Sequence, residues 1–301
     1  MQQIKYYLLA CILTVGAVIQ GASGQEQQAA DSLKVQAKEV KKETMKAYSQ
    51  AEWFYWGLRA GGGQMGWSHD NDQVTVDPGT AFSGGLFFNF RPLKGTEIEV
   101  GVDVMKLTTK ASMEAYSATV NTTDDEGDKY EQRVAVKNVT EEQELLLLNV
   151  PVALKLYASP GNWELFVKGG VEYRHALKAE YDQSGQFTRQ GYYSQWDLLI
   201  DELPDRGYYT NRRLDSSGDL TWKAVFDPFV GAGVVFPGLK SNFFIEGRYY
   251  LGGSDPVDEK VARPFAGPEG NGSVINYNNE SLLQTGKVSL NGFLVNIGLR
   301  F

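Results

Sequence analysis

Eight segments of the chain alternate between apolar and polar residues at every second position. They span 53–67, 80–92, 96–110, 144–157, 163–181, 221–236, 242–252 and 290–301. A period of two is typical of a β-strand whose two faces meet different surroundings. In the fifth segment, Leu165 and Val167 alternate with Glu164 and Lys168. The pattern predicts an all-β protein of eight antiparallel strands.

The connections between these segments alternate in length. Three are short and rich in turn residues: 93–95, 158–162 and 237–241. Four are long: 68–79, 111–143, 182–220 and 253–289. Tight turns at one end and long loops at the other are typical of an up-and-down transmembrane β-barrel. A soluble sandwich rarely sorts its loop lengths in this way.

The two faces of each predicted strand differ in charge. The apolar faces are free of charge over five or six positions per strand, which matches the roughly 9–11 residues that a tilted strand needs to cross a bilayer. A charge at mid-depth on such a face would cost about 2–4 kcal/mol. We therefore expect the apolar faces to contact lipid. Aromatic residues near the ends of these faces, among them Tyr55, Trp56, Trp163 and Tyr181, predict an interfacial girdle.

The opposite faces carry nearly equal numbers of bases and acids. The eight bases are Arg59, Arg91, Lys155, Lys168, Arg174, Lys223, Arg248 and Arg300. The seven acids are Glu97, Glu99, Asp103, Glu164, Glu172, Asp227 and Glu246. Eight strands leave an interior just wide enough for side chains, and buried charges are tolerated when they are paired. We expect an ion-pair network that fills the lumen; the alternative is a selectivity lining or a proton path.

The first residues have the features of a secretory signal. A short region ending at Lys5 precedes an apolar stretch over 6–19 and the small residues of 21–24, which predicts cleavage after Gly24 and export to the outer membrane. Cys11 is the single cysteine, so cleavage would remove any disulfide or thiol chemistry. Residues 25–50 have helical spacing and predict a polar periplasmic helix ahead of a barrel over 51–301.

The chain ends within the alternating pattern. Every second position is apolar in the final segment: Phe293, Val295, Ile297, Leu299 and Phe301. This ending resembles the C-terminal assembly signal of bacterial outer-membrane proteins. Together with residues 148–155 and 245–252 it is similar to the porin-family, PorT-like β-barrels of the Bacteroidota, which are eight-stranded and related in architecture to OmpA and OmpX. The resemblance covers about 50–301 and implies two partners, outer-membrane lipid and the barrel-assembly machinery, but no reaction.

The long connection after the fifth segment is the best candidate for a binding surface. It carries Tyr192, Tyr193, Trp196, Tyr208, Tyr209, Arg212 and Arg213. Aromatic and arginine enrichment is typical of recognition surfaces, so we expect an extracellular protein or glycan partner there. The alternative is a loop that packs over the barrel mouth. The net charge of −8 argues against a nucleic-acid partner.

Catalytic and metal sites are weakly indicated. The two histidines, His69 and His175, have no adjacent pairing of nucleophile and base. The acidic run 124–128 lacks the spacing of a calcium loop and predicts a solvated tip. We expect no enzyme activity, metal or cofactor. The predicted role is structural or interactive, through the outer loops or the periplasmic helix, with an extracellular or periplasmic protein or glycan as the partner. The alternatives are a narrow porin or transporter for small solutes and, third, a membrane-embedded enzyme.

Overall fold

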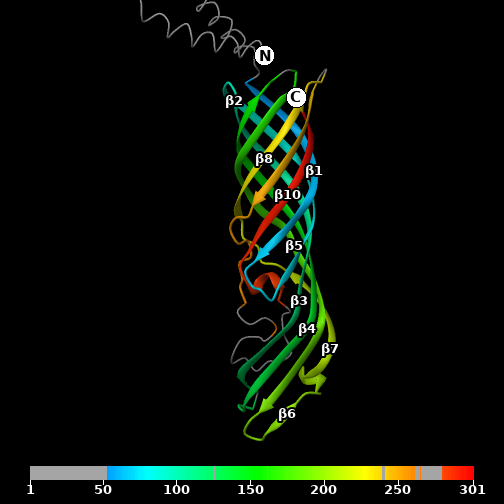
Figure 1. The fold of residues 1–301 in the computed structure, drawn as a ribbon. Helices are drawn as coiled ribbons and strands as arrows, with labels where there is room; N and C mark the ends of the chain where they lie inside the picture. Colours follow the sequence, from blue (N-terminus) through cyan, green and yellow to red (C-terminus); the bar gives the residue numbers. More distant parts are fainter. Residues whose placement is uncertain (1–52, 125, 161, 239–240, 262–264, 266–279) are drawn as a thin grey trace, which may run out of the picture.

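The computed structural model describes residues 53–301, apart from 125, 161, 239–240, 262–264 and 266–279 (Figure 1). The predicted signal peptide over 1–24 and the predicted helix over 25–50 lie outside the described residues. Among the described residues, no helix has the length and hydropathy that crossing a bilayer requires.

Ten strands form one antiparallel sheet within the described part of the chain. They are β1 (Phe54–His69), β2 (Thr75–Leu93), β3 (Thr96–Thr123), β4 (Lys129–Ala158), β5 (Glu164–Tyr193), β6 (Leu198–Ile200), β7 (Tyr209–Asp219), β8 (Val225–Phe236), β9 (Asn242–Leu251) and β10 (Val288–Arg300). The two 3-10 helices are η1 (Pro204–Arg206) and η2 (Leu282–Thr285).

Strand pairing closes part of this sheet into a ring. Strands β1 to β5 pair in order, β5 pairs with β8, β8 with β9, β9 with β10, and β10 with β1. The short strands β6 and β7 pair with β5 outside the ring. The sequence predicted eight strands, whereas the sheet has ten, because the segment 182–220, predicted as a loop, contains β6 and β7. The C-terminus marks one end of the ring, and we call the opposite end the mouth (Figure 1).

Side chains alternate across the wall of the ring. In β9, Phe243 and Ile245 are exposed on the outside, whereas Phe244 and Glu246 are buried inside. All eight ring strands carry exposed large apolar side chains on their outer faces. This is the inverse of a soluble β protein, whose apolar face would be buried.

Two residues predicted in the girdle lie inside instead. Tyr55 and Tyr181 are buried on the inner faces of β1 and β5, whereas Trp56 and Trp163 are exposed. Tyr55 has the parity of the inward side chains of β1, whereas Tyr181 lies inside because a register shift at Leu177 reverses the alternation of β5 from even inward positions, as at Arg174, to odd ones, as at Ala179. Local position parity therefore places both tyrosines inside the ring, and their assignment to the girdle was wrong. Facing direction follows that parity and not the aromatic character of a residue.

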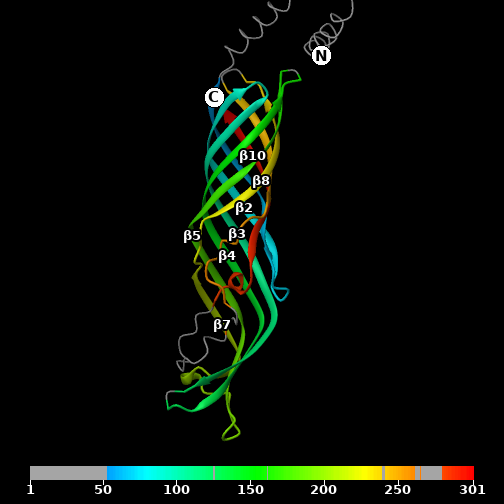
Figure 2. The same cartoon turned by 90° about the vertical axis from the view of Figure 1, so that its left-hand side faces the viewer.

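Three strands continue far beyond the ring. Strands β3, β4 and β5 have 28, 30 and 30 residues, against 10 in β9. Beyond the mouth they form, with β7, a sheet that we call the projecting sheet (Figure 2). At about 3.3 Å per residue, the longest strands reach roughly 100 Å along their own path.

The prediction of loops over 111–143 and 68–79 was therefore wrong. Strands β3 and β4 continue to a turn at 124–128, and the β1–β2 connection shrinks to 70–74. In β3 the alternation is interrupted at Glu114 and Ala115, which are both exposed. In β4 it is hidden by a register shift at Asn138, whose φ is 50°. Buried positions are even before it, as at Val136, and odd after it, as at Val139. A window with an unbroken period of two does not detect such a strand.

Candidate functional site

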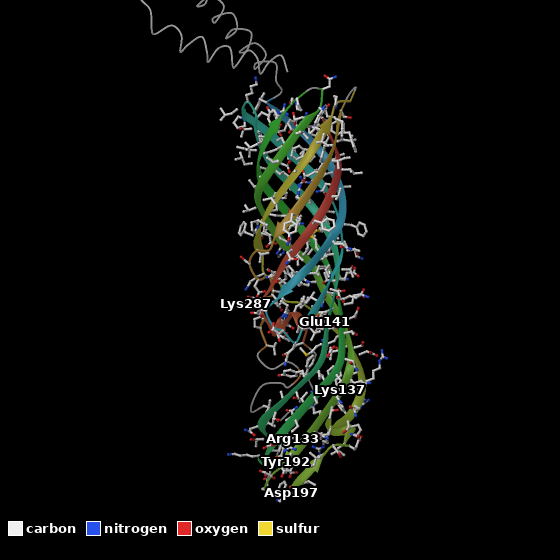
Figure 3. The ribbon with its side chains drawn as sticks, in the orientation of Figure 1. Arg133, Lys137, Glu141, Tyr192, Asp197 and Lys287 are labelled. Carbon is white, nitrogen blue, oxygen red and sulfur yellow. The ribbon has the colours of Figure 1, made fainter. Side chains whose placement is uncertain are left out.

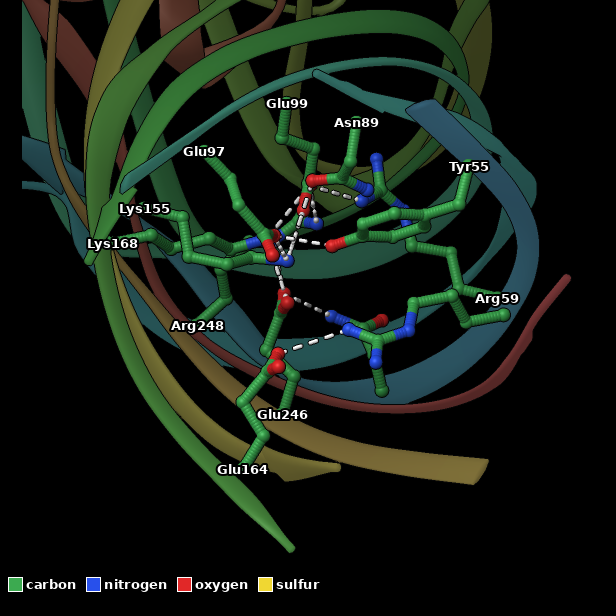
Figure 4. A network of polar contacts seen from close by, with 12 residues as sticks. Tyr55, Arg59, Asn89, Glu97, Glu99, Lys155, Glu164, Lys168, Glu246 and Arg248 are labelled. Atoms are coloured by element: carbon green, nitrogen blue, oxygen red, sulfur yellow. Dashed lines mark hydrogen bonds and ion pairs between the residues drawn. The ribbon is translucent and has the colours of Figure 1, made fainter. Parts of the chain in front are cut away.

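Glu99 on β3 lies at the centre of the charges inside the ring (Figure 4). Its carboxylate is 2.7 Å from Arg59 Nη1 and 2.8 Å from Lys168 Nζ. Lys155 Nζ lies at 3.4 Å and Arg248 Nη2 at 3.7 Å. The four cations come from β1, β4, β5 and β9, so one carboxylate connects strands around the ring.

A second carboxylate, Glu246 on β9, shares cations with this centre. Lys168 Nζ lies 2.6 Å from Glu246 Oε2, and Arg248 Nε donates to Glu246 Oε1 at 2.7 Å. Arg59 also contacts Asp103, with Nη2 2.6 Å from Oδ2. Each of the four cations around Glu99 thus has more than one anionic contact, which is the condition under which buried charges are tolerated.

The network continues toward both ends of the ring. On the mouth side, Arg174 contacts Asp227 and lies 2.9 Å from Glu172, which accepts a hydrogen bond from Tyr250. On the terminal side, another set joins Arg91, Arg300, Tyr55, Glu97 and Glu164. The structure therefore pairs each member of the predicted set: Arg59, Arg91, Glu97, Glu99, Asp103, Lys155, Lys168, Glu172, Arg174, Glu246, Arg248 and Arg300.

Lys223 differs from the other predicted inward bases. Its side chain is half exposed, and its ammonium lies 3.8 Å from the exposed carboxylate of Asp258. The residue precedes β8, so the alternation of that strand does not set its direction. The sequence also missed the uncharged members of the network. Tyr55 and Asn89 are buried against Glu97 and Lys155, and their position parity on β1 and β2 is the signal that could have identified them.

Aromatic rings fill the space beside the charges. Phe87, Phe166 and Phe244 form a buried cluster near the terminal end, and the cavity among them and Glu99 measures about 10 Å³. A single water molecule needs about 10–15 Å³. The inward glycines leave room for these side chains, since a Cβ on Gly101 would meet the guanidinium of Arg59. This part of the lumen is packed with side chains.

An apolar layer lies between the charge network and the mouth. Buried side chains from several ring strands form it, together with Leu283 of η2: Met65, Trp67, Met105, Leu107, Leu145, Leu147 and Leu290. Leu282 and Leu283 are both fully buried. The residues 281–287, which we call the mouth segment, thus fold into the outer end of the ring.

Glu141 on β4 holds the mouth segment in place. Its buried carboxylate accepts hydrogen bonds from Ser281 Oγ at 2.5 Å and from the backbone N–H of Leu282 at 2.8 Å. The side-chain amides of Gln143 and Gln183 donate two more, at 2.7 and 2.9 Å. Burial raises the pKa of the Glu141 carboxyl, although these donors oppose the shift. Figure 3 shows Glu141 and Lys287 at a similar height along the molecule, at the level of the mouth.

The far end of the projecting sheet, which we call the apex, comprises the turn 124–128 and residues 190–208 (Figure 3). Tyr130, Tyr193 and Tyr208 form its buried core, with ring centroids of Tyr130 and Tyr193 5.0 Å apart. Tyr193 Oη donates to Asp124 at 3.1 Å and so joins the two turns. Burial and this acceptor raise the pKa of Tyr193 to about 12, which keeps its proton in place.

Some residues of the predicted binding loop are buried in the apex, and others are exposed on its surface. Tyr193 and Tyr208 are buried, whereas Trp196 is exposed. Tyr192 lies under the guanidinium of Arg133, and Tyr209 contacts Arg212. Arg213 is exposed and lies 3.7 Å from Asp215. The sequence argument did not include the exposed leucines beside Trp196: Leu198, Leu199 and Leu203.

The predicted assembly signal lies on the outer face of β10. Its five side chains are all exposed: Phe293, Val295, Ile297, Leu299 and Phe301. Phe301 pairs with Trp56 of β1 through two backbone hydrogen bonds of 2.8 and 3.3 Å. Their rings stack with centroids 4.8 Å apart. The last residue thus completes the seam that closes the ring.

The residues considered for metal or catalytic chemistry make structural contacts. Within the described ranges, no group of three or more His, Cys, Asp or Glu is placed to hold a metal ion. Asp124 accepts hydrogen bonds from the backbone N–H groups of Glu126 and Asp128, which shapes its own turn. His69 contacts the carbonyl of Leu282 at 3.2 Å, and burial lowers the pKa of its ring.

Comparisons with known proteins give remote similarities in structure. No protein-family model matches the chain. No curated protein matches it. The solved structure of Ail, the attachment invasion locus protein of Yersinia pestis in complex with the heparin analogue sucrose octasulfate, is 10% identical, with a TM-score of 0.28 over 83% of this chain and 100% of that one.

Two further structures are similar at the same level. The translocator domain of the autotransporter NalP from Neisseria meningitidis is 11% identical, with a TM-score of 0.23 over 91% of this chain and 98% of that one. OccAB4 of Acinetobacter baumannii is 9% identical, with a TM-score of 0.15 over 84% and 99%. These three proteins are all Gram-negative outer-membrane β-barrel proteins.

Proposed function

We propose that the chain is an outer-membrane β-barrel whose ring anchors the projecting sheet and presents its apex to an extracellular protein or glycan. The observation that carries this proposal is the continuation of β3, β4 and β5 beyond the ring to an ordered apex with exposed apolar side chains. A strand needs about 9–11 residues to cross hydrocarbon, so most of each long strand lies outside it. Lipid contact accounts for the exposed apolar side chains around the ring.

The filled lumen supports an interaction role over the porin alternative. A charge network, an aromatic cluster and an apolar layer follow one another along the inside of the ring. Passage of a solute would have to break ion pairs such as that of Lys168 with Glu246. We expect no steady single-channel current in a planar bilayer; regular open channels would overturn this part of the proposal and favour a narrow porin. We propose no catalytic role.

The orientation of the apex is tested with single cysteines. Cys11, the one native cysteine, lies in the predicted signal, so an introduced thiol would be the sole target in the mature chain. Trp196→Cys at the apex and Lys94→Cys in the β2–β3 turn are matched exposed positions at opposite ends. We expect a membrane-impermeant maleimide to label the cysteine at position 196 in intact cells. The cysteine at position 94 should be labelled only after the outer membrane has been permeabilised. The reverse pattern would overturn the proposal.

A further inference from the structure

The apex carries apolar side chains that the surrounding bilayer does not reach. Leu177, the last exposed apolar residue of β5 at the ring, is separated from Tyr193 by roughly 50 Å of strand at about 3.3 Å per residue. Yet Trp196 is 56% exposed and Leu198 46% exposed. Leu203, at 42%, lies in the same short segment. Clustered exposed apolar side chains are typical of interaction sites.

Three of these side chains share one face. Trp196 stacks on Tyr193 with ring centroids 5.4 Å apart, and Leu198 is the register partner of Tyr193. Leu203 exchanges two backbone hydrogen bonds of 3.1 Å with Tyr208. Because paired residues of an antiparallel ladder point to the same side, the three lie on the face of the tyrosine core. We call Trp196, Leu198 and Leu203 the apolar patch.

The tyrosine core holds the patch in a fixed geometry. Tyr130 stacks on Tyr193, and Tyr193 in turn donates to Asp124 in the neighbouring turn. The turn at Asp197, which has a φ of 48°, is fastened by a 2.8 Å hydrogen bond from Tyr192 to the carboxylate. A patch that is already ordered loses little conformational freedom when a partner binds.

Carboxylates are interleaved with the apolar patch. Between 194 and 206 there are four acids and one base: Asp197, Asp201, Glu202, Asp205 and Arg206. All five are exposed. Glu126 and Asp128 add acids on the adjoining turn. A surface of this kind repels anionic glycans, nucleic acids and anionic lipid, and it attracts cations.

We propose that the apex binds a cationic amphipathic polypeptide segment. Its apolar side chains pack on the apolar patch, and its lysine or arginine side chains pair with Asp197, Asp201, Glu202 and Asp205. A neutral sugar would stack on Trp196 but would leave Leu198 and Leu203 without an apolar partner. The inference rests on the proposed function, because the apex must face outward for a partner to reach it.

The test uses the full chain in nanodiscs of zwitterionic phosphatidylcholine. The probe is a fluorescent amphipathic peptide of lysine and leucine, titrated by anisotropy against empty nanodiscs as the reference. We expect saturable binding that weakens with salt. A peptide with serine in place of leucine lacks the apolar contacts, and one with glutamate in place of lysine lacks the ion pairs. Each should bind at least 10-fold more weakly.

Variants of the protein test the apolar contacts and the charged contacts separately. Leu198→Ser with Leu203→Ser, and a neutralised variant with Asn or Gln at the four acids, should each raise the Kd at least 10-fold. Leu199→Ser is the matched control: it is 43% exposed but is paired with Tyr192 on the opposite face, so its Kd should change less than 3-fold. All of these positions are exposed, and an unchanged heat-modifiable band on gels checks their folding.

Three outcomes would overturn the inference. They are binding no tighter than to empty nanodiscs, equal binding by the Leu198 and Leu203 double variant, and binding of a neutral oligosaccharide such as maltoheptaose in place of the peptide. Each is distinguishable from a failure of the proposed function. Surface labelling of Trp196→Cys reports the orientation of the apex whether or not any peptide binds.

Discussion

At the scale of single residues, Glu99 has more cationic contacts than any other carboxylate described in the lumen. Four cations lie within 4 Å of its carboxylate. Replacement by glutamine keeps the shape of the side chain but leaves Lys168 and Arg59 with less compensating charge. Breaking a buried pair costs about 3–5 kcal/mol. We expect Glu99→Gln to lower the free energy of unfolding by about 3 kcal/mol, measured by urea unfolding in detergent micelles with tryptophan fluorescence.

Glu144 provides the matched control for that change. It lies on the outer face of β4, where its carboxylate is 2.7 Å from Lys106 Nζ and both side chains are exposed. Exposed pairs contribute about 0–1 kcal/mol, so Glu144→Gln should leave the unfolding midpoint almost unchanged. If both variants lost the same stability, the lumen pairs would be no more important than surface pairs.

At the scale of an element, the local stability of the mouth segment should depend on pH. Burial and the nearby Glu259 raise the pKa of Glu280 from 4.5 to about 7. Its backbone carbonyl accepts a hydrogen bond from Gln183 at the start of the segment. A carboxyl whose pKa is raised on folding stabilises the folded form when it is protonated. This stabilisation is complete below about pH 4.5 and is lost as the pH rises through about 7.

Amide exchange measures this dependence directly. Protection factors of Leu282 and Leu283, corrected for intrinsic exchange, should fall between pH 5 and pH 8 by an amount equivalent to about 1–2 kcal/mol after allowance for solvent screening. Glu280→Gln removes the titrating group and should remove the part of the fall centred near pH 7. Glu141, whose pKa is also raised by burial, accounts for any remaining pH dependence. A full pH dependence in Glu280→Gln would contradict the assignment.

Which elements the sequence predicts depends on whether the period of two is unbroken. The ring strands were located within a few residues because lipid-facing and lumen-facing positions differ strongly in polarity. The outer half of β4 was missed because Asn138 shifts its phase by one residue, and that of β3 because its alternation changes phase at Glu114 and Ala115. The mouth segment has no periodic signal at all. Its position depends on Glu141, which is 140 residues away from Ser281 in the sequence.

The functional residues also differ in how far the sequence predicts them. The lumen charges could be grouped from the sequence because strand parity alone assigns each of them to the inner face. The apex could not, because Tyr193 is buried by Tyr130 and Tyr208 from other parts of the chain, while its register partner Leu198 stays exposed beside it. Residue type indicated the tyrosines and arginines, whereas cross-strand pairing determines which side chains reach the surface.

At the scale of the whole molecule, closure of the ring depends on the pairing of the first and last strands. Phe301 pairs with Trp56 through backbone hydrogen bonds, and their rings stack on the outer face. Phe301→Ser keeps the backbone pairing but removes the stacked ring and the last apolar position of the predicted assembly signal. We expect the folded, heat-modifiable fraction in outer membranes to fall several-fold, as read from gels of unboiled samples.

Phe236→Ser separates assembly from simple lipid contact. Phe236 ends β8 at the same end of the ring, and its exposure of 41% matches the 42% of Phe301. If loss of an apolar ring at the lipid boundary were the whole effect, the two variants would assemble equally poorly. Because β8 is an internal strand of the ring and β10 must find β1 to close it, we expect Phe236→Ser to assemble nearly normally. Equal defects would argue that closure does not depend on the terminal residue.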